Sequence, residues 1–146
     1  MTAKRAALWL CPRCGRAFAS QHQTHSCRTL RSLDDHFLRC EPAVRETFDA
    51  VRAAAQQLGP LTVLPEQTRI AFQVRMSFAA FMPRRHWLNG HLILATIIDS
   101  PRFTSVQVFS PRNVLHAFRL CSPIEVDPEF VGWLESAYAV GRQDHR

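Results

Sequence analysis

Two cysteines separated by two residues begin the part of the sequence that best fits a defined chemistry, 9-WLCPRCGRAF-18. The spacing of Cys11 and Cys14 lets both thiolates bind one tetrahedral metal ion. Gly15 follows directly and can adopt the left-handed backbone conformation that turns N–H groups toward the sulfur atoms. Redox use of a C-x-x-C pair is the competing interpretation, but no thioredoxin-like strand–helix–strand pattern surrounds the motif. The sequence therefore predicts half of a structural zinc site.

Two further ligands are needed, and residues 22–40 offer more than one set. His25 and Cys27 leave ten residues between the second and third ligands, although the single residue between them is a tighter gap than in ordinary fingers. His36 and Cys40 lie four apart on one face of an expected helix but require a loop of 21 residues. His22 is a further candidate. A closed four-ligand site leaves no position for a catalytic water, so it would stabilise structure rather than perform chemistry.

The rest of the sequence bounds the compartment and the class of protein. A chain of 146 residues with 47% hydrophobic residues can form one domain with a small attached module. No run approaches the roughly 18 apolar residues of a membrane span. The start, MTAKRAALWL, is too short for a signal peptide. We therefore expect a cytoplasmic protein without a membrane partner, in which clustered thiols stay reduced and indicate metal binding.

Basic residues are distributed unevenly along the chain, whose net charge is +6. Residues 1–31 contain six basic residues and no acid, and residues 69–119 contain seven arginines against Asp99 alone. The acids gather in 34–49 and 125–144. Arginine's planar fork suits phosphate and carboxylate recognition, although a GC-rich coding sequence explains the same bias. The distribution permits nucleic-acid binding without establishing it.

The elements that position these residues follow from hydrophobic periodicity. Pro42 begins a helix with an apolar stripe, Gly59-Pro60 ends it, and Asp127 caps a second helix. Residues 61–122 alternate with period two, which predicts four or five short strands with a hairpin turn at Asn89-Gly90. The clearest strand patterns are 69–80, 91–98, 103–109 and 114–121. This order predicts an α+β fold, an antiparallel meander covered on one face by two helices.

Three segments result from this reading: a zinc-binding, finger-like module over 1–31, a short helix and linker over 32–42, and an α+β domain over 43–146. In the module, Phe18 fits a small aromatic core, against which Trp9 packs from the other side.

Four separated stretches together resemble a bacterial domain family of unknown function. They are WLCPRCGRAF…HSC, TRIAFQVRMSFAAFMPRRHWLNGHLIL, SPRNVLHAFRL and WLESAYAVGRQ. In actinobacterial members of that family, a C-P-x-C-G finger precedes the α+β domain. The resemblance implies that His25 and Cys27 belong to the metal module, and Cys40 is not part of the shared pattern. It implies a fold and no activity.

The main domain lacks the motifs of common catalytic sites. It contains no phosphate loop, dinucleotide fingerprint, nucleophile elbow or H-E-x-x-H sequence. Asp99 is the sole acid of residues 69–119, which is too little for a metal-dependent nuclease. His116 and Cys121 point to opposite faces of their strand and so do not form a catalytic pair. We therefore expect no catalytic residues and no enzymatic activity.

Cationic and aromatic side chains remain as candidates for binding. They are Arg69, Arg75, Arg84, Arg85, Trp87, Arg112, His116 and Arg119. Arg69, Gln73 and Arg75 share one face of their predicted strand. Arginine forks pair with phosphate and an aromatic ring can stack a base, so the set fits an anion-binding or nucleic-acid-binding surface. The alternative is the solvated face of a half-buried sheet.

Three hypotheses for function follow. The leading one is a non-enzymatic zinc protein that binds nucleic acid or another polyanion. The second is a pocket for a small acidic ligand, with weak enzymatic activity as an extension. A closed cavity lined by Arg69, Arg75, Arg119 and His116 favours it, and an open convex basic face favours the first. The third is an adaptor whose zinc module docks a protein partner, which an exposed apolar patch around Trp9 and Phe18 would favour.

Overall fold

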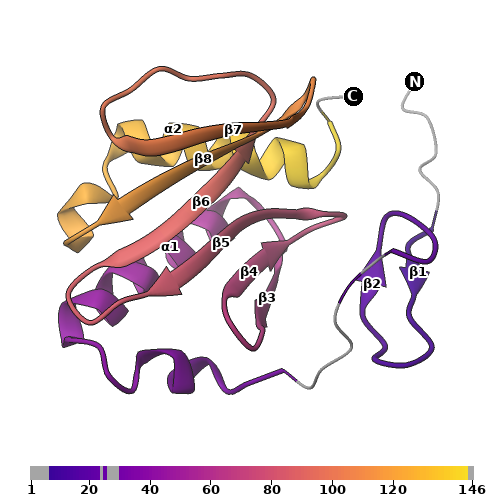
Figure 1. The fold of residues 1–146 in the computed structure, drawn as a ribbon, viewed down its shortest axis with the longest axis horizontal. Coiled ribbons are helices and arrows are strands. Elements are labelled where there is room, and N and C mark those ends of the chain that lie inside the picture. Colours follow the sequence, from indigo (N-terminus) through magenta and orange to yellow (C-terminus); the bar gives the residue numbers. More distant parts are fainter. Residues whose placement is uncertain (1–6, 24, 26–29, 145–146) are drawn as a thin grey trace.

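The computed structural model describes residues 7–23, 25 and 30–144 of the chain. Its main body is a six-stranded antiparallel sheet with two α-helices packed on one face (Figure 1). The helices are α1 (Pro42–Leu58) and α2 (Pro128–Gly141). The strands are β3 (Thr62–Pro65), β4 (Ile70–Gln73), β5 (Ser77–Pro83), β6 (Leu88–Leu94), β7 (Phe103–Ser110) and β8 (Asn113–Leu120), in the order β3-β4-β5-β6-β8-β7. The predicted α+β class is confirmed, with six strands in place of four or five. The predicted meander holds from β3 to β6 only, because β8 pairs with β6 and β7 lies at the edge of the sheet.

A smaller antiparallel sheet precedes the main body. It consists of β1 (Trp9–Leu10) and β2 (Ala17–Phe18), and Figure 1 shows it beside the β3–β4 end of the large sheet. Two 3-10 helices complete the fold, η1 (Leu33–Phe37), where a short helix is predicted, and η2 (Pro123–Glu125). No helix in the described part of the chain is long and apolar enough to cross a lipid bilayer.

Aromatic residues between the helices and the sheet form the centre of the core. Phe48 of α1 is fully buried, and its ring lies 5.9 Å from that of Phe72 and 5.6 Å from that of Phe81. Both helices begin where the sequence predicts, and the Asp127 carboxylate accepts a 2.9 Å hydrogen bond from the Phe130 N–H at the start of α2. These start signals are local, which explains why they can be recognised without the rest of the fold.

The predicted strand over 69–80 is divided into β4 and β5. Residues 74–76 form the turn between them, and the N–H groups of Arg75 and Met76 both donate to the Gly141 carbonyl, at 2.9 and 3.1 Å. The end of α2 therefore supplies the acceptor for this turn. The period-two pattern continues through the turn, so periodicity alone could not reveal it.

The predicted hairpin at Asn89-Gly90 is wrong, because both residues lie inside β6. The chain turns earlier, between Pro83 and Leu88. A Cβ atom on Gly90 would lie 2.7 Å from the Phe118 ring and 2.8 Å from the Ala80 carbonyl oxygen. Glycine is required here by close packing between neighbouring strands, not by a turn.

The small sheet and the main body are in direct contact. The Arg16 guanidinium lies 3.0 Å from the Glu66 carboxylate, and the Gln73 side-chain amide donates a 2.6 Å hydrogen bond to the Ala17 carbonyl. These contacts hold the β1–β2 unit against the turn before β4 and the end of β4. They also position the site described next.

Candidate metal centre and adjoining cavity

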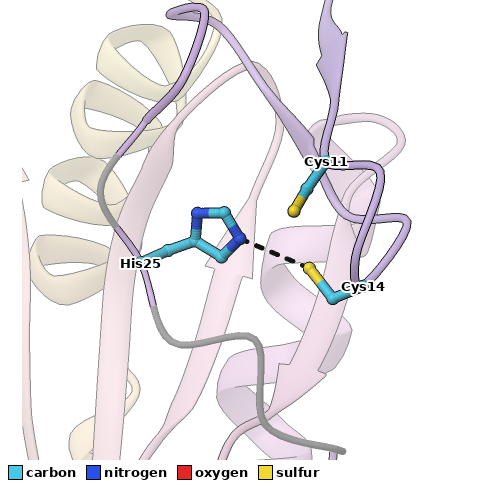
Figure 2. Close-up of side chains that lie close together, drawn as sticks. All are labelled: Cys11, Cys14 and His25. Atoms are coloured by element: carbon cyan, nitrogen blue, oxygen red, sulfur yellow. Dashed lines mark hydrogen bonds between the residues drawn. The ribbon is translucent and has the colours of Figure 1, made fainter.

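Three side chains of the N-terminal part converge on one point. The Sγ atoms of Cys11 and Cys14 and a ring nitrogen of His25 all lie within 4.8 Å of one another, and Figure 2 shows both sulfurs facing the imidazole. The Cys14 Sγ is 3.3 Å from the His25 Nε2. Zinc binds sulfur at about 2.3 Å and nitrogen at about 2.0 Å, so ligands of one tetrahedral ion are spaced on this scale. These three residues can hold a metal ion.

The β1–β2 turn places the two cysteines. Gly15 has a φ of +74°, the left-handed conformation that the sequence predicts for it. The Gly15 N–H donates to the Cys11 carbonyl at 2.8 Å, and the Cys11 N–H donates to the Arg16 carbonyl at 2.9 Å. This tight turn brings the two sulfur atoms to the same side of the strand pair.

A hydrogen bond at the second ring nitrogen, Nδ1, orients the His25 side chain. The Gln23 carbonyl lies 2.5 Å from Nδ1. A carbonyl can only accept, so Nδ1 carries the proton and Nε2 keeps its lone pair for the metal side, an arrangement typical of metal-binding histidines. The Phe18 ring packs on the imidazole at 4.3 Å, and Trp9 lies 6.2 Å from Phe18. The predicted aromatic core of the module is confirmed.

The alternative ligands lie elsewhere. The His36 Nε2 hydrogen-bonds the Glu66 carbonyl at 2.8 Å, and the Cys40 Sγ lies 3.7 Å from the His36 carbonyl. Neither side chain joins the cysteine cluster, in the part of the chain that the structure describes. The predicted fourth ligand, Cys27, lies outside the described residues.

A cavity of about 680 Å³ adjoins this centre, between the N-terminal module and the sheet face that the helices leave uncovered. The module contributes Arg16, Phe18, Ala19, Ser20, Gln23 and His25. The main body contributes Glu66, Arg69, Gln73, Arg75, Met76, Ser77, Ala79, His91, Ile93, Phe109, Asn113, Leu115 and Gln143. His25 is therefore both a candidate metal ligand and part of the cavity wall.

The charged lining of the cavity is positive. Arg16, Arg69 and Arg75 stand against one acid, Glu66, among the described lining residues. The Glu66 carboxylate is shared, since Arg16 lies 3.0 Å from one oxygen and Arg69 lies 2.9 Å from the other. The Arg75 Nε donates a 2.9 Å hydrogen bond to the Gln143 side chain. Guanidinium groups therefore outnumber carboxylates among the described lining residues, a composition that favours an anion.

His91 of β6 lies in the part of the cavity wall that the main body contributes. Its register partners are Ala80 and Ala117, whose side chains carry no polar atom, and the imidazole makes no hydrogen bond to any residue that the structure describes. Burial, reinforced by the positive charge of Arg69, lowers the pKa of His91 to about 4. The ring is therefore neutral at pH 7 and available to a ligand.

The predicted cationic residues do not form one surface. Arg69 and Arg75 line the cavity, whereas Arg84 and Arg85 lie on the β5–β6 turn beside a second hollow of about 1040 Å³. The Arg119 guanidinium stacks over the Trp87 ring at 4.1 Å.

Two further predicted binding residues lie apart from these groups. Arg112 is exposed in the β7–β8 turn. His116 is completely buried, and both of its ring nitrogens are occupied: Nε2 accepts from the Ile98 N–H at 2.9 Å, and Nδ1 donates to the Val114 carbonyl at 3.0 Å. Burial lowers the pKa of His116, so the ring is a neutral element of the core.

Sequence reasoning missed His91, Arg16 and Phe109 as cavity residues. His91 and Ile93 share one face of β6, and this alternation was the available signal. No sequence pattern marks Arg16 and Phe109 as cavity residues, because their places in the wall depend on contacts between segments distant in the sequence.

Residues 33–141 match the family described as Domain of unknown function (DUF5655), and the chain belongs to this family. The match begins with η1 and ends with α2, so it covers the main body and leaves the β1–β2 unit outside. No curated protein and no solved structure matches the chain.

Proposed function

We propose that this chain is a non-enzymatic zinc protein that binds a small anionic ligand in the cavity between its N-terminal module and its sheet. The observation that carries the proposal is the cavity itself, which three arginines line and in which two of them, Arg16 and Arg69, share the carboxylate of Glu66. Its volume of about 680 Å³ is within the range of small-molecule sites. Because the hollow is bounded by two parts of the chain, it fits the second hypothesis better than a flat basic surface would.

Zinc is the metal that the donor set favours. Two thiolates and an imidazole are typical of structural zinc, and Cys27 would complete a Cys₃His site. With four protein ligands, the ion would have no position for a water or a substrate. In this proposal the metal holds the module in shape, and the module in turn forms one wall of the cavity.

A titration with small anions tests the proposal. Inorganic phosphate, citrate and glutamate are added to the zinc-loaded chain, and binding is followed by calorimetry and by NMR shifts of β4 and β6. Arg69→Gln is expected to lower affinity about ten- to a hundred-fold, since hydrogen bonds to a charged group contribute about 1.5–3 kcal/mol. Arg84→Gln, on the distant β5–β6 turn, is the matched control. The proposal fails if the wild-type chain binds none of these anions at millimolar concentration.

Nucleic-acid binding is the second candidate, and the second hollow favours it. Arg31, Arg39, Arg84 and Arg85 line this hollow beside Asp35 and Glu41. Within the described residues, Arg39, Arg84 and Arg85 form no ion pair, so their guanidinium groups remain available to phosphates. A gel-shift assay at low and moderate salt is the test, with Arg84→Ala/Arg85→Ala as the variant. Absence of retention at low salt would end this candidate.

The adaptor hypothesis receives less support. Trp9 and Phe18 are half-buried and pack against each other and His25, which leaves Leu10 as the exposed large apolar residue of β1 and β2. One exposed leucine does not form a docking patch.

A further inference from the structure

The cavity has two chemically different sides. On the β4 side lie Arg69 and Arg75, together with the Arg16–Glu66 pair. On the other side lie apolar residues of three neighbouring strands: Ile93 of β6, Leu115 of β8 and Phe109 of β7.

Ile93 and Leu115 are direct cross-strand partners, so their side chains form a continuous apolar floor. Phe109 is 58% exposed although it is aromatic, and it lines the cavity from near the end of β7. An apolar floor with an exposed aromatic ring gains stability when an apolar group covers it. An inorganic ion would use the basic side and leave this floor in contact with water.

His91 lies beside the boundary between the two sides. It is two residues before Ile93 on the same face of β6, and Arg69 is close enough to affect its charge. A neutral imidazole can donate one hydrogen bond to an oxyanion, and its carbon edges remain compatible with an apolar neighbour. From the β4 side to the β7 side, the cavity is therefore lined first by the arginines, then by the His91 imidazole and then by the apolar floor.

Building on the proposed function, we propose that the ligand is an organic anion with an apolar body. Its oxyanion head, a carboxylate or a phosphate ester, lies between Arg69, Arg75 and His91. Its body covers Ile93, Leu115 and Phe109. A volume of about 680 Å³ accommodates both parts, whereas a lone phosphate would occupy only a small fraction of it.

A series of probes with one head and increasing body length tests this inference. Acetate, butanoate and hexanoate are titrated into the zinc-loaded chain and followed by NMR, which covers millimolar affinities. Each added methylene is expected to raise affinity about three- to four-fold, the value for burying one CH₂ group. Butyl phosphate and inorganic phosphate form a second arm that distinguishes the two head groups.

Two variants separate the sides of the cavity. Phe109→Ser removes an exposed ring and Leu115→Thr shortens the floor, and both are expected to reduce the gain per methylene without changing the affinity for acetate. Arg69→Gln is expected to weaken all probes equally. Ile124→Thr, at a position 83% exposed on η2, is the control for a general loss of surface hydrophobicity.

The outcomes distinguish this inference from the proposed function. If acetate and hexanoate bind equally well, the apolar body contributes nothing and the inference is overturned, while anion binding stands. If Phe109→Ser and Leu115→Thr leave the dependence on chain length unchanged, the body binds elsewhere and the inference is also overturned. If no probe binds, both proposals fail.

Discussion

The β1–β2 module and the sheet–helix body are stabilised in different ways. Among the described residues of the module, Cys11 alone is buried, and each of its strands has two residues. The main body contains one continuous cluster of twenty buried residues, from Phe37 to Tyr138. Burial of apolar area can stabilise the second region but not the first. We therefore expect the folding of the module to depend on a metal ion and that of the main body to be independent of it.

Removal of the metal is expected to have the largest effect, and the effect should be confined to the module. Structural zinc contributes on the order of 10 kcal/mol to the folding of such small units. A chelator, or Cys14→Ser, should abolish the dispersed NMR signals of residues 9–18 and leave those of the main body in place. Cys121→Ser, an exposed cysteine after β8, is the control. Simultaneous unfolding of both regions would show that the main body also depends on the metal.

The same experiment connects the metal to the cavity. Since β2 and His25 form part of the wall, chelation should also weaken binding of small anions. Coupling of this kind is reciprocal, so a bound anion should raise the affinity for zinc by the same factor. An anion affinity that is equal with and without metal would show that the module does not shape the cavity.

Phe48→Ala is expected to have the next largest effect, on the main body alone. The side chain is fully buried and packs against Phe37, Phe72 and Phe81, so its removal should lower the free energy of unfolding by about 4 kcal/mol. Urea denaturation measures this loss. Zinc affinity, measured without denaturant, should remain that of the wild type. A parallel loss of zinc affinity would show that the module folds only on an intact main body.

Features encoded by a few neighbouring residues could be predicted from the sequence. Pro42 and Gly59 bound α1, Asp127 caps α2, and the C-x-x-C-G turn has the predicted left-handed Gly15. Each of these depends on local backbone chemistry.

Features that arise between distant segments could not be predicted. Arg16 and Arg69 meet because Glu66 pairs with both, a contact across fifty positions in the case of Arg16. His116 was predicted to bind an anion or nucleic acid, yet its side chain is completely buried and its Nε2 accepts a hydrogen bond from the Ile98 N–H. The cavity forms only where the module packs on the sheet. The sequence alone therefore could not distinguish the arginines that line the cavity from the arginines that lie elsewhere on the surface.

Stability at acid pH is expected to depend on His91. The folded-state pKa is about 4 and the unfolded value about 6.5, so the unfolded chain binds the proton first as pH falls. The contribution of neutral His91 to the free energy of unfolding is fully present above pH 6.5. It is lost progressively as the pH falls to 4, by about 3 kcal/mol in total. His91→Asn should remove this part of the pH dependence in urea denaturation between pH 7 and pH 4.

The pKa values of His36 and His116 are also lowered by burial, so some acid sensitivity should persist in this variant. Gln107→Ala, at an exposed position of β7, should retain the full wild-type dependence. If His91→Asn behaves like this control, the imidazole is more hydrated than the cavity wall indicates.

Gly90→Ala is expected to lower the stability of the main body by about 2 kcal/mol, the usual range for overpacking. The added methyl would lie 2.7 Å from the Phe118 ring and 2.8 Å from the Ala80 carbonyl oxygen, and a backbone atom cannot move aside easily. Gly132→Ala in α2 is the matched control, because nothing in the described part of the chain lies within 4 Å of its Cβ position. It should raise stability by up to about 1 kcal/mol through helix propensity. Equal effects at both glycines in urea denaturation would contradict the packing argument.

Gly15→Ala is expected to have the smallest effect, and it should appear in the module alone. No atom of the residues that the structure describes lies within 4 Å of the added methyl, so the substitution creates no clash with them, but the φ of +74° is unfavourable for any residue with a Cβ. The strain is about 1 kcal/mol, which corresponds to roughly five-fold weaker zinc binding in a competition assay with a coloured chelator. The unfolding of the main body should not change. Gly15→Asn tests the cause, because asparagine tolerates this conformation better than alanine and should recover part of the affinity. If alanine and asparagine weaken zinc binding equally, the glycine is needed for space around the metal and not for its backbone conformation.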